Sequence, residues 1–294
     1  MSDFVQQQHT ICNFSNEENW VILSPIEQSI KQKIESVGTP LKDWDIKIYR
    51  GVLTGYNDAF IISTEKRDEI LANCQNEDER LRTAELIRPI LRGRDIKRYG
   101  YDWANLWLIN THNGIKGVKP RIDINEYPAV KAHLDQYWDK ISKRADKGDT
   151  PYNLRNCAYL DDFFKPKVMW KIIGCNINFS FDDGTMICNN AVDIMTGQRN
   201  QLLQFLGLMN SKLFDWYLKL TTEAEVQGGG IQLYVTTLEK TLVKLDFPLY
   251  LSEIINQRVN GIVTDTEVDN TIFESYKLTQ EEINYILTCK QVDR

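Results

Sequence analysis

Two segments of the chain carry side chains and turns suited to binding a polyanion. The first segment, residues 50–62, has two apolar runs joined by a turn, and its turn-forming and polar members are Gly51, Thr54, Gly55, Tyr56 and Asn57. The second segment, residues 87–99, holds five cations within eleven residues around Gly93, namely Arg88, Arg92, Arg94, Lys97 and Arg98. Glycine lets a backbone turn tightly beside a ligand, and guanidinium groups form paired hydrogen bonds to phosphates and base edges. These residue types favour a module that reads DNA over a catalyst.

Other polar and aromatic side chains could face the same groove. One group precedes an expected strand and comprises Asn153, Arg155, Asn156, Lys165 and Lys167. Asn189 and Asn190 carry amides suited to an adenine edge, although an adjacent Asn pair also marks turns. Trp103 and Trp107 could frame a base or a sugar.

The basic cluster of residues 88–98 has a second interpretation. Its cations could form a solvated helix face that Glu85 and Asp95 neutralise. Gly93 in the middle of the cluster, and Tyr99-Gly100-Tyr101 behind it, favour a loop instead. Arginines fixed on a loop are more often used for recognition.

The overall charge of −6 argues against a nucleic-acid binder, so its distribution matters. Residues 1–45 and residues 249–294 each carry a net −4, which leaves +2 for residues 46–248. The excess of acids is thus confined to the two ends. With a pI of about 5.3, we expect a binder that works within a larger assembly supplying further phosphate contacts.

Catalytic and metal-binding patterns are missing from the sequence. His9, His112 and His133 are isolated, and Asp182-Asp183-Gly184 is better explained as a turn than as a metal site. There is no G-x-S-x-G elbow and no phosphate loop with its lysine. The F-x-G-x-G and [DN]-P-P-[YF] motifs of adenine-amino methyltransferases are absent too, so we expect no methyl transfer by this chain alone.

The compartment is predicted from three features. The first ten residues have no basic start leading into an apolar run, and no apolar stretch has membrane-spanning length. The six cysteines lie far apart without a paired spacing, as in reduced thiols. We therefore expect a cytoplasmic protein without a membrane partner.

Periodicity predicts an α/β fold with a mixed, twisted sheet flanked by helices and a helical C-terminal region. We expect a flexible segment over residues 1–19, an α/β domain over 20–200, and a helical region over 201–294 packed against it. Helices are predicted over 20–37, 64–73, 79–87, 127–145, 201–220 and from 267 onward, and strands over 46–53, 59–63, 106–110, 166–171, 186–194 and 231–235. The turn at residues 55–58 would join the first two strands. Ser24 with Glu27, and Thr279 with Glu282, are the expected helix starts.

The order of these motifs resembles the TaqI-like C-terminal specificity domain of type IIG restriction-modification enzymes and adenine-specific DNA methyltransferases. The resemblance runs from about Trp20 to Leu287. The matching pieces are Gly51–Phe60, Ile90–Ile96, Pro166–Val168, Gly207–Phe214, Gly228–Ile231 and Tyr276–Glu282.

The resemblance implies a region that reads the recognition sequence, while S-adenosylmethionine binding and base flipping belong to a methyltransferase part that this chain lacks. It implies that the glycine turn lies beside double-stranded DNA, that the basic loop neutralises phosphates or reads guanine, that Lys212 reaches a phosphate from its helix, and that the 228–230 loop closes against a groove. The predicted DNA-binding residues are Gly51, Thr54, Gly55, Tyr56, Asn57, Arg92, Gly93, Arg94, Lys97, Arg98, Asn156, Lys165, Lys167, Lys212, Gly228 and Gly229. On this view, Arg92→Ala or Arg94→Ala weakens DNA binding.

Two alternatives remain at this point. The chain could be a component of an active adenine-specific methyltransferase or type II restriction endonuclease whose catalytic part is on another chain or in a missing region. It could also be a degenerate interaction protein that has lost its affinity for DNA, which the acidic pI keeps open.

Overall fold

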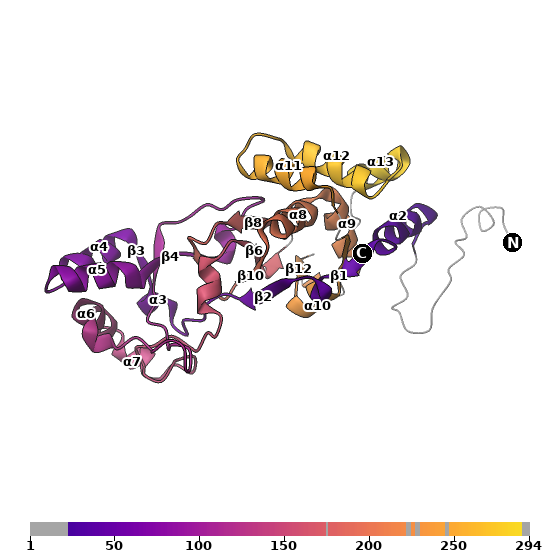
Figure 1. Cartoon of the computed structure of the whole chain (residues 1–294). Helices are drawn as coiled ribbons and strands as arrows, with labels where there is room; N and C mark the ends of the chain where they lie inside the picture. Colours follow the sequence, from indigo (N-terminus) through magenta and orange to yellow (C-terminus); the bar gives the residue numbers. More distant parts are fainter. Residues whose placement is uncertain (1–22, 175, 222–224, 227–229, 245–246, 290–294) are drawn as a thin grey trace.

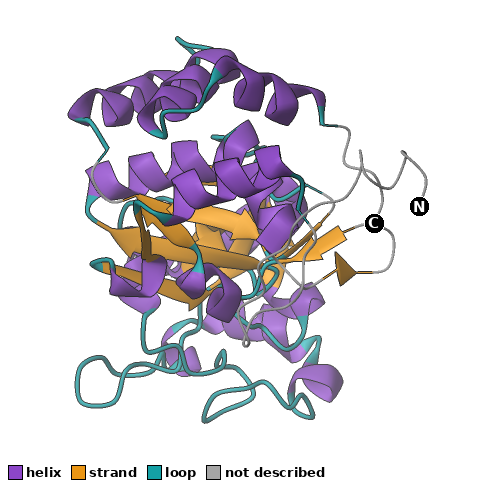
Figure 2. Cartoon of the chain, turned by 90° about the vertical axis from the view of Figure 1, so that its right-hand side faces the viewer, coloured by secondary structure: helices purple, strands orange, loops and turns teal. Residues whose placement is uncertain are grey.

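The computed structural model describes residues 23–174, 176–221, 225–226, 230–244 and 247–289. Two four-stranded sheets lie at its centre, one beside the other along the long direction of the molecule (Figure 1). Helices cover the first sheet in two successive layers, and loops extend from the opposite end (Figure 2). The architecture confirms the predicted α/β class, with two four-stranded and two smaller sheets among the described residues where one sheet was expected.

The elements follow one another along the chain with short connections. In order they are α2 (Pro25–Glu35), β1 (Gly38–Pro40), η1 (Leu41–Asp43), β2 (Ile46–Arg50), α3 (Asn57–Phe60), β3 (Ile61–Ser63), α4 (Thr64–Ala72), α5 (Glu77–Leu86), β4 (Ile87–Leu91), η2 (Gly93–Asp95), β5 (Leu106–Ile109), η3 (Ile124–Glu126), α6 (Pro128–Asp135), α7 (Trp138–Ile141), η4 (Leu160–Phe164), β6 (Lys167–Lys171), β7 (Ile173–Gly174), β8 (Phe179–Asp182), β9 (Ile187–Cys188), β10 (Val192–Gly197), α8 (Arg199–Asn210), α9 (Lys212–Thr221), β11 (Glu225–Val226), β12 (Gly230–Gln232), α10 (Val235–Lys240), β13 (Leu242–Lys244), α11 (Leu249–Val259), α12 (Asp265–Ser275) and α13 (Gln280–Thr288).

The first sheet has the order β2-β10-β6-β8 and is antiparallel throughout. Strands β6, β8 and β10 are almost wholly buried, while the edge strand β2 is only partly covered. On β6, Val168 and Trp170 face one apolar cluster while Met169 faces the other, as the alternation of side chains along a strand requires. Helices α8, α9 and α11 to α13 belong to the first cluster, and α2 joins it from the start of the chain.

The second sheet has the order β3-β5-β4-β9, in which β4 and β9 run parallel. It packs with α4, α5 and α6 around the second apolar cluster, whose buried members all lie between Val52 and Ile194. Strand β9 leads through residues 189–191 directly into β10 of the first sheet. The two sheets therefore meet where β4 and β9 end.

The strand pairing differs from the expectation at the first turn. The expected strand over 46–53 ends at Arg50, and residues 59–63 enter the second sheet, where β3 pairs with β5. Residues 57–60 form the short helix α3 between them. The turn at residues 55–58 thus connects two sheets and does not close a pair of neighbouring strands.

Two expected long helices are interrupted. The helix over 127–145 is divided into α6 and α7. The helix over 201–220 breaks at Ser211, whose hydroxyl donates to the Leu208 carbonyl at 2.6 Å and accepts from the amide of Phe214. A side chain that bonds the backbone in this way ends one helix and caps the next.

The helix starts that depend on local chemistry are confirmed. Ser24 with Glu27, and Thr279 with Glu282, each form the reciprocal pair of hydrogen bonds of a capping box. The expected flexible segment 1–19 and the glycines Gly228 and Gly229 lie outside the described residues.

Lys167 and Asp182 form an ion pair that is almost completely shielded from solvent, with 0% and 1% of their side-chain surfaces exposed. The Lys167 ammonium also donates to the carbonyl of Phe163 at 2.6 Å. Burial alone would raise the pKa of Asp182, but the charge of Lys167 and the hydrogen bonds to the carboxylate lower it below its usual value. The prediction that Lys167 contacts DNA is wrong for this fold, because its charge is enclosed between β6 and β8.

Removing the lysine should leave a buried, uncompensated carboxylate. We expect Lys167→Met to lower the free energy of unfolding by about 3–5 kcal/mol. Lys165→Ala is the matched control, since Lys165 pairs with Asp162 but is itself 59% exposed, and its loss should cost about 1 kcal/mol or less. Urea unfolding at pH 7 measures both, and equal losses in the two variants would refute the assigned role.

Candidate nucleic-acid interface

Four strand ends converge where the two sheets meet. Arg50 ends β2, Lys171 ends β6, and Asn190 lies just before β10. The Arg50 Nε donates to the carbonyl of Asn190 at 3.2 Å. Arg94 stands in the turn η2 that follows β4. We call these four residues the junction surface.

Tight backbone packing holds the junction surface together. A Cβ placed on Gly93 would lie 3.5 Å from the Cβ of Lys171 and 3.3 Å from the carbonyl oxygen of Ala191. The amide of Gly51 donates to the Val192 carbonyl at 2.8 Å, and a Cβ on Gly51 would overlap the carbonyl of Asn189. Gly51 is therefore needed for contact between strands, whereas the sequence suggested contact with a duplex.

The cations of the junction surface are free of carboxylate partners. Arg50 and Arg94 are exposed and Lys171 is partly exposed. None of the three forms an ion pair with a described residue. Unpaired cations on neighbouring strand ends produce a local positive potential even on a chain of negative net charge.

A buried carboxyl group lies beneath this surface. Asp193, directly opposite Arg50 in the pairing of β10 with β2, is 3% exposed, and its Oδ1 has no hydrogen-bond partner. Burial raises the pKa of Asp193 to about 6, and the charge of Arg50 opposes that rise. Asp193 and Arg50 form no ion pair among the described residues, but their charges attract each other when Asp193 is ionised at neutral pH.

Two arginines of the predicted cluster form ion pairs with carboxylates of the protein. Arg92 forms a forked interaction with Asp95, with distances of 3.0 and 2.9 Å, so the interpretation that Asp95 neutralises part of the cluster is confirmed for this residue. Arg98 pairs with Asp265 at 3.1 Å and donates to the carbonyl of Asn210. The structure thus corrects the expectation that Arg92 and Arg98 are free to bind phosphates.

Arg94 and Lys97 are exposed, whereas Arg88 is half-buried on β4 with its guanidinium over the ring of Phe164 at 5.0 Å. Lys97 lies 3.6 Å from Asp102 and donates to the carbonyl of Arg94 at 3.3 Å. Arg94 itself has no acidic partner among the described residues. Lys212 is exposed at the start of α9, where its backbone amide donates to Asp269 at 2.8 Å.

Asp265 connects the basic loop to the C-terminal helices. It accepts from Arg98 and also from the Nε of Arg258 at 2.5 Å, and the Arg258 guanidinium stacks over the ring of Tyr99 at 4.7 Å. The loop is therefore fixed on α11 and α12, away from the turn at Gly55.

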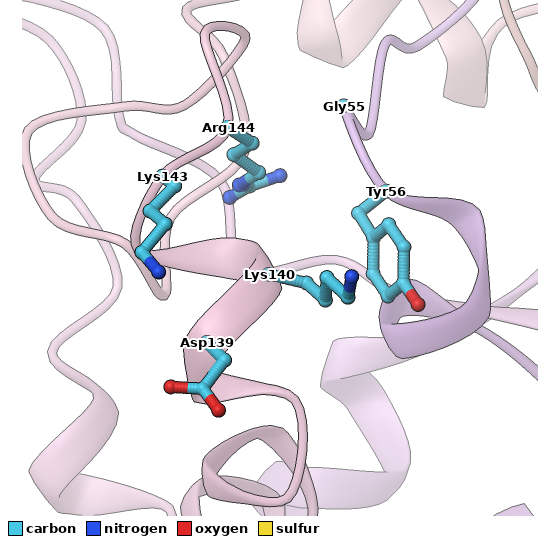
Figure 3. A pocket seen from close by; sticks show the side chains of 6 residues that line it. All are labelled: Gly55, Tyr56, Asp139, Lys140, Lys143 and Arg144. Carbon is cyan, nitrogen blue, oxygen red and sulfur yellow. The ribbon is translucent and has the colours of Figure 1, made fainter.

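The turn at Gly55 lines an open cleft of about 490 Å³ (Figure 3). We call it the lysine cleft; its lining residues are Gly55, Tyr56, Asp139, Lys140, Lys143 and Arg144. Gly55 has a φ of +68°, and a Cβ there would lie 2.6 Å from the carbonyl oxygen of Asp146, so this position requires glycine. Thr54 is buried and donates to the Oδ1 of Asn57 at 2.6 Å.

Arg144 supports the lysine cleft from below. Its buried guanidinium donates to the carbonyls of Thr54, Pro151 and Asn153, and it stacks over Phe60 at 4.3 Å. Burial lowers the pKa of Arg144 to about 10, which leaves it charged at neutral pH. Arg144 therefore fixes the Gly55 turn against the loop that follows α7.

The other predicted residues have local partners. Asn156 is exposed, and its side-chain oxygen accepts from Asn113. Lys165 pairs with Asp162 and stays 59% exposed. Trp103 and Trp107 pack edge to face at 5.1 Å. Their indole N–H groups donate to the carbonyl of Leu106 and the hydroxyl of Thr64, so both rings already have partners within the protein.

Sequence reasoning missed Arg50, Lys171, Lys140 and Lys143. The two lysines before Arg144 look like the solvated face of a long helix, and only the break between α6 and α7 turns them towards the Gly55 turn. Arg50 and Lys171 are single cations at strand ends, a weak signal until the pairing of β2, β10 and β6 is known.

Two structural searches of the described residues gave negative results. No group of three or more metal-ligating side chains converges there. No described helix combines the length and the apolar character needed to cross a bilayer.

Comparison with protein families gives a match over slightly more than half of the chain. The model described as "TaqI-like C-terminal specificity domain" matches residues 88–241. That range includes the basic loop, Lys171, Asn190 and both lysines of the cleft. No match is found among curated proteins.

Two solved structures are similar to the chain. The type IIG restriction endonuclease BpuSI matches with a TM-score of 0.58 and 14% identity, over 90% of this chain and 32% of that protein. The type IIL restriction-modification enzyme MmeI, solved in complex with DNA, matches with a TM-score of 0.55 and 14% identity, over 84% of this chain and 35% of that protein. The chain thus spans about a third of these proteins and shares their fold over that part.

A substitution at Gly51 tests its role in strand packing. We expect Gly51→Ala to lower the free energy of unfolding by about 1–3 kcal/mol, because the new methyl group meets the backbone of Asn189. Gly100→Ala is the matched control, since a Cβ there meets nothing within 4 Å. Thermal or urea unfolding compares the two, and an unaffected Gly51→Ala protein would disprove the close approach.

Asp193 should make stability depend on pH. Its folded pKa of about 6 exceeds the usual 3.8, so its contribution to stability is fully present below about pH 4 and is lost as pH rises through 6. Asp193→Asn should remove this loss, roughly 3 kcal/mol for a two-unit shift. The measurement is the unfolding free energy of the variant minus that of the parent at pH values from 4 to 7. This difference should increase as the pH rises. A constant difference contradicts the assignment.

Proposed function

The chain belongs to the TaqI-like C-terminal specificity domains, and we propose that its junction surface contacts double-stranded DNA and reads a target sequence for a restriction-modification enzyme. The observation that carries this proposal is that Arg94 and Lys171 have no acidic partners among the described residues and lie on strand ends where the two sheets meet, while Arg50 ends β2 on the other face of the first sheet. Within a chain of net charge −6, unpaired cations in one place indicate an anionic ligand.

The side chains of the junction surface suit both parts of DNA recognition. Lysine binds phosphates as a point charge, while an arginine fork matches the O6 and N7 atoms of guanine or a phosphate. The amide of Asn190 could pair with the N6 and N7 atoms of adenine. Phosphate contacts would set the position of the chain on the duplex, and base contacts would select the sequence.

We infer that this chain has no catalytic activity on its own. The adenine-specific methyl transfer or DNA cleavage would come from a methyltransferase or endonuclease part on another segment or chain, and S-adenosylmethionine would bind there. A cytoplasmic location, where DNA of the cell and of invaders is accessible, is part of the same proposal.

Binding to duplexes selected from a random pool tests the function. We expect the full chain to enrich a defined sequence, with an affinity that falls as salt rises because bound cations release counterions. If no duplex binds at low salt, the proposed function is wrong and the chain has lost, or never had, affinity for DNA.

Variants of the junction surface test the assignment of residues. Arg94→Ala and Lys171→Ala should each weaken binding and reduce the slope of log K against log salt by about 0.9 for each phosphate that is no longer neutralised. If one of them reads a base, about 1–3 kcal/mol of discrimination should disappear at a single base pair. Lys42→Ala is the control, because Lys42 is exposed and lies before the opposite end of β2. Fluorescence anisotropy at several salt concentrations measures the binding constants. If the slopes of log K against log salt for Arg94→Ala and Lys171→Ala equal that of the control, neither residue contacts DNA.

A further inference from the structure

We propose that the lysine cleft holds a backbone phosphate of the same duplex that the junction surface reads, with Lys140 and Lys143 as the contacts. This inference rests on the proposed function and adds a second point of attachment to it. The residues that carry it are two lysines from the region of α7 and the Gly55 turn, which the fold brings together from positions far apart in the sequence.

The first argument is charge. Lys140 and Lys143 are exposed, and neither side chain forms an ion pair or a hydrogen bond with a described residue. Asp139 also lines the cleft, but its carboxylate points away from Tyr56, whereas the Lys140 ammonium points towards that ring (Figure 3). The Lys143 ammonium points away from Tyr56 in Figure 3, so this flexible side chain has to turn to join Lys140 at a ligand.

The second argument is the floor of the cleft. The hydrogen-bonded donors of Arg144 face three backbone carbonyls and no carboxylate. The guanidinium keeps its positive charge beneath the cleft, with its two terminal nitrogens bonded to the protein and the charge of Asp146 nearby. Arg144 is a positioning residue here, since it holds the turn and contributes to the potential without reaching the ligand.

The third argument is distance. Five residue steps separate Arg50 from Gly55, which spans at most about 18 Å of extended chain. The major groove of B-DNA is about 12 Å wide and is bordered by phosphates on both sides. The Gly55 turn therefore lies close enough to Arg50 for one duplex to reach both.

The form of the cleft favours a phosphodiester of a large ligand over a small bound anion. It is wide and open, about 490 Å³, and its free cations are flexible lysines rather than a rigid set of buried donors. Lysines of this kind bind phosphate as point charges, and such contacts depend on neighbouring contacts of the same polyanion.

The test uses the full chain and a duplex obtained by selection. We compare the parent with Lys140→Gln/Lys143→Gln and with the control Lys42→Gln, checking by circular dichroism that all three are folded. The double variant should bind several-fold more weakly at about 0.1 M salt, its salt slope should be smaller by about 1–2, and its preferred sequence should be unchanged.

Uncharged methylphosphonate linkages, placed one at a time along both strands, locate the contact. Neutralisation of one linkage, or of two adjacent linkages, should weaken duplex binding by the parent and the control. The same change should have little further effect on binding by the double variant. If every neutralised linkage affects the double variant as much as the parent, or if the salt slope is unchanged, the inference is wrong while the proposed function stands. If the parent binds no duplex, both fail.

Discussion

The buried ion pair between Lys167 and Asp182 determines how the two sheets are placed. Lys167 is bound to Asp182 across β6 and β8 and to the carbonyl of Phe163 in η4. The two carboxylate oxygens of Asp182 also accept the backbone amides of Gly184, Thr185 and Met186, the Thr185 hydroxyl and the Tyr101 hydroxyl. These bonds shape the turn that carries the chain from β8 of the first sheet into β9 of the second. The positions of Lys171, Asn190 and Arg94 follow from this arrangement.

The same chemistry explains how an acidic chain can present a basic surface. Cations that are surrounded by protein, such as Lys167, Arg92 and Arg98, are paired with carboxylates, because an unpaired charge in a poorly solvated place is costly. Arg144 is an exception that is bonded to neutral carbonyls. Cations in contact with water need no such partner, and those at the strand ends remain available. The net charge of the chain therefore says little about the potential at one surface.

Local patterns in the sequence predicted local structure well. The capping boxes at Ser24 and Thr279 involve groups three residues apart, so the sequence alone contains both partners. The prediction of an α/β fold followed from periodicity, and the resemblance to a DNA-reading family followed from motif order. The contacts of Arg98 could not be foreseen in that way, since its hydrogen bond to the carbonyl of Asn210 joins residues 112 positions apart. Strands β2 and β10 also pair across a long stretch of sequence. Without knowledge of that pairing, the sequence gives no reason to place Arg50 and Lys171 in the same sheet. The turn at Gly55 was located correctly, but the lysines opposite it depend on where a helix breaks.

The residues of the two apolar clusters are synthesised at different times, because they occupy different ranges of the sequence. The buried members of the second cluster lie between Val52 and Ile194, so they are all available well before synthesis ends. The first cluster joins Ile30 of α2 to Ile286 of α13, and the hydrogen bond from Ser29 to Glu282 spans 253 positions. Closing contacts of such long range is slow, because much chain entropy is lost before they form. The part of the chain that contains the Gly55 turn can thus fold before α13 has been synthesised, and α13 completes the first cluster afterwards.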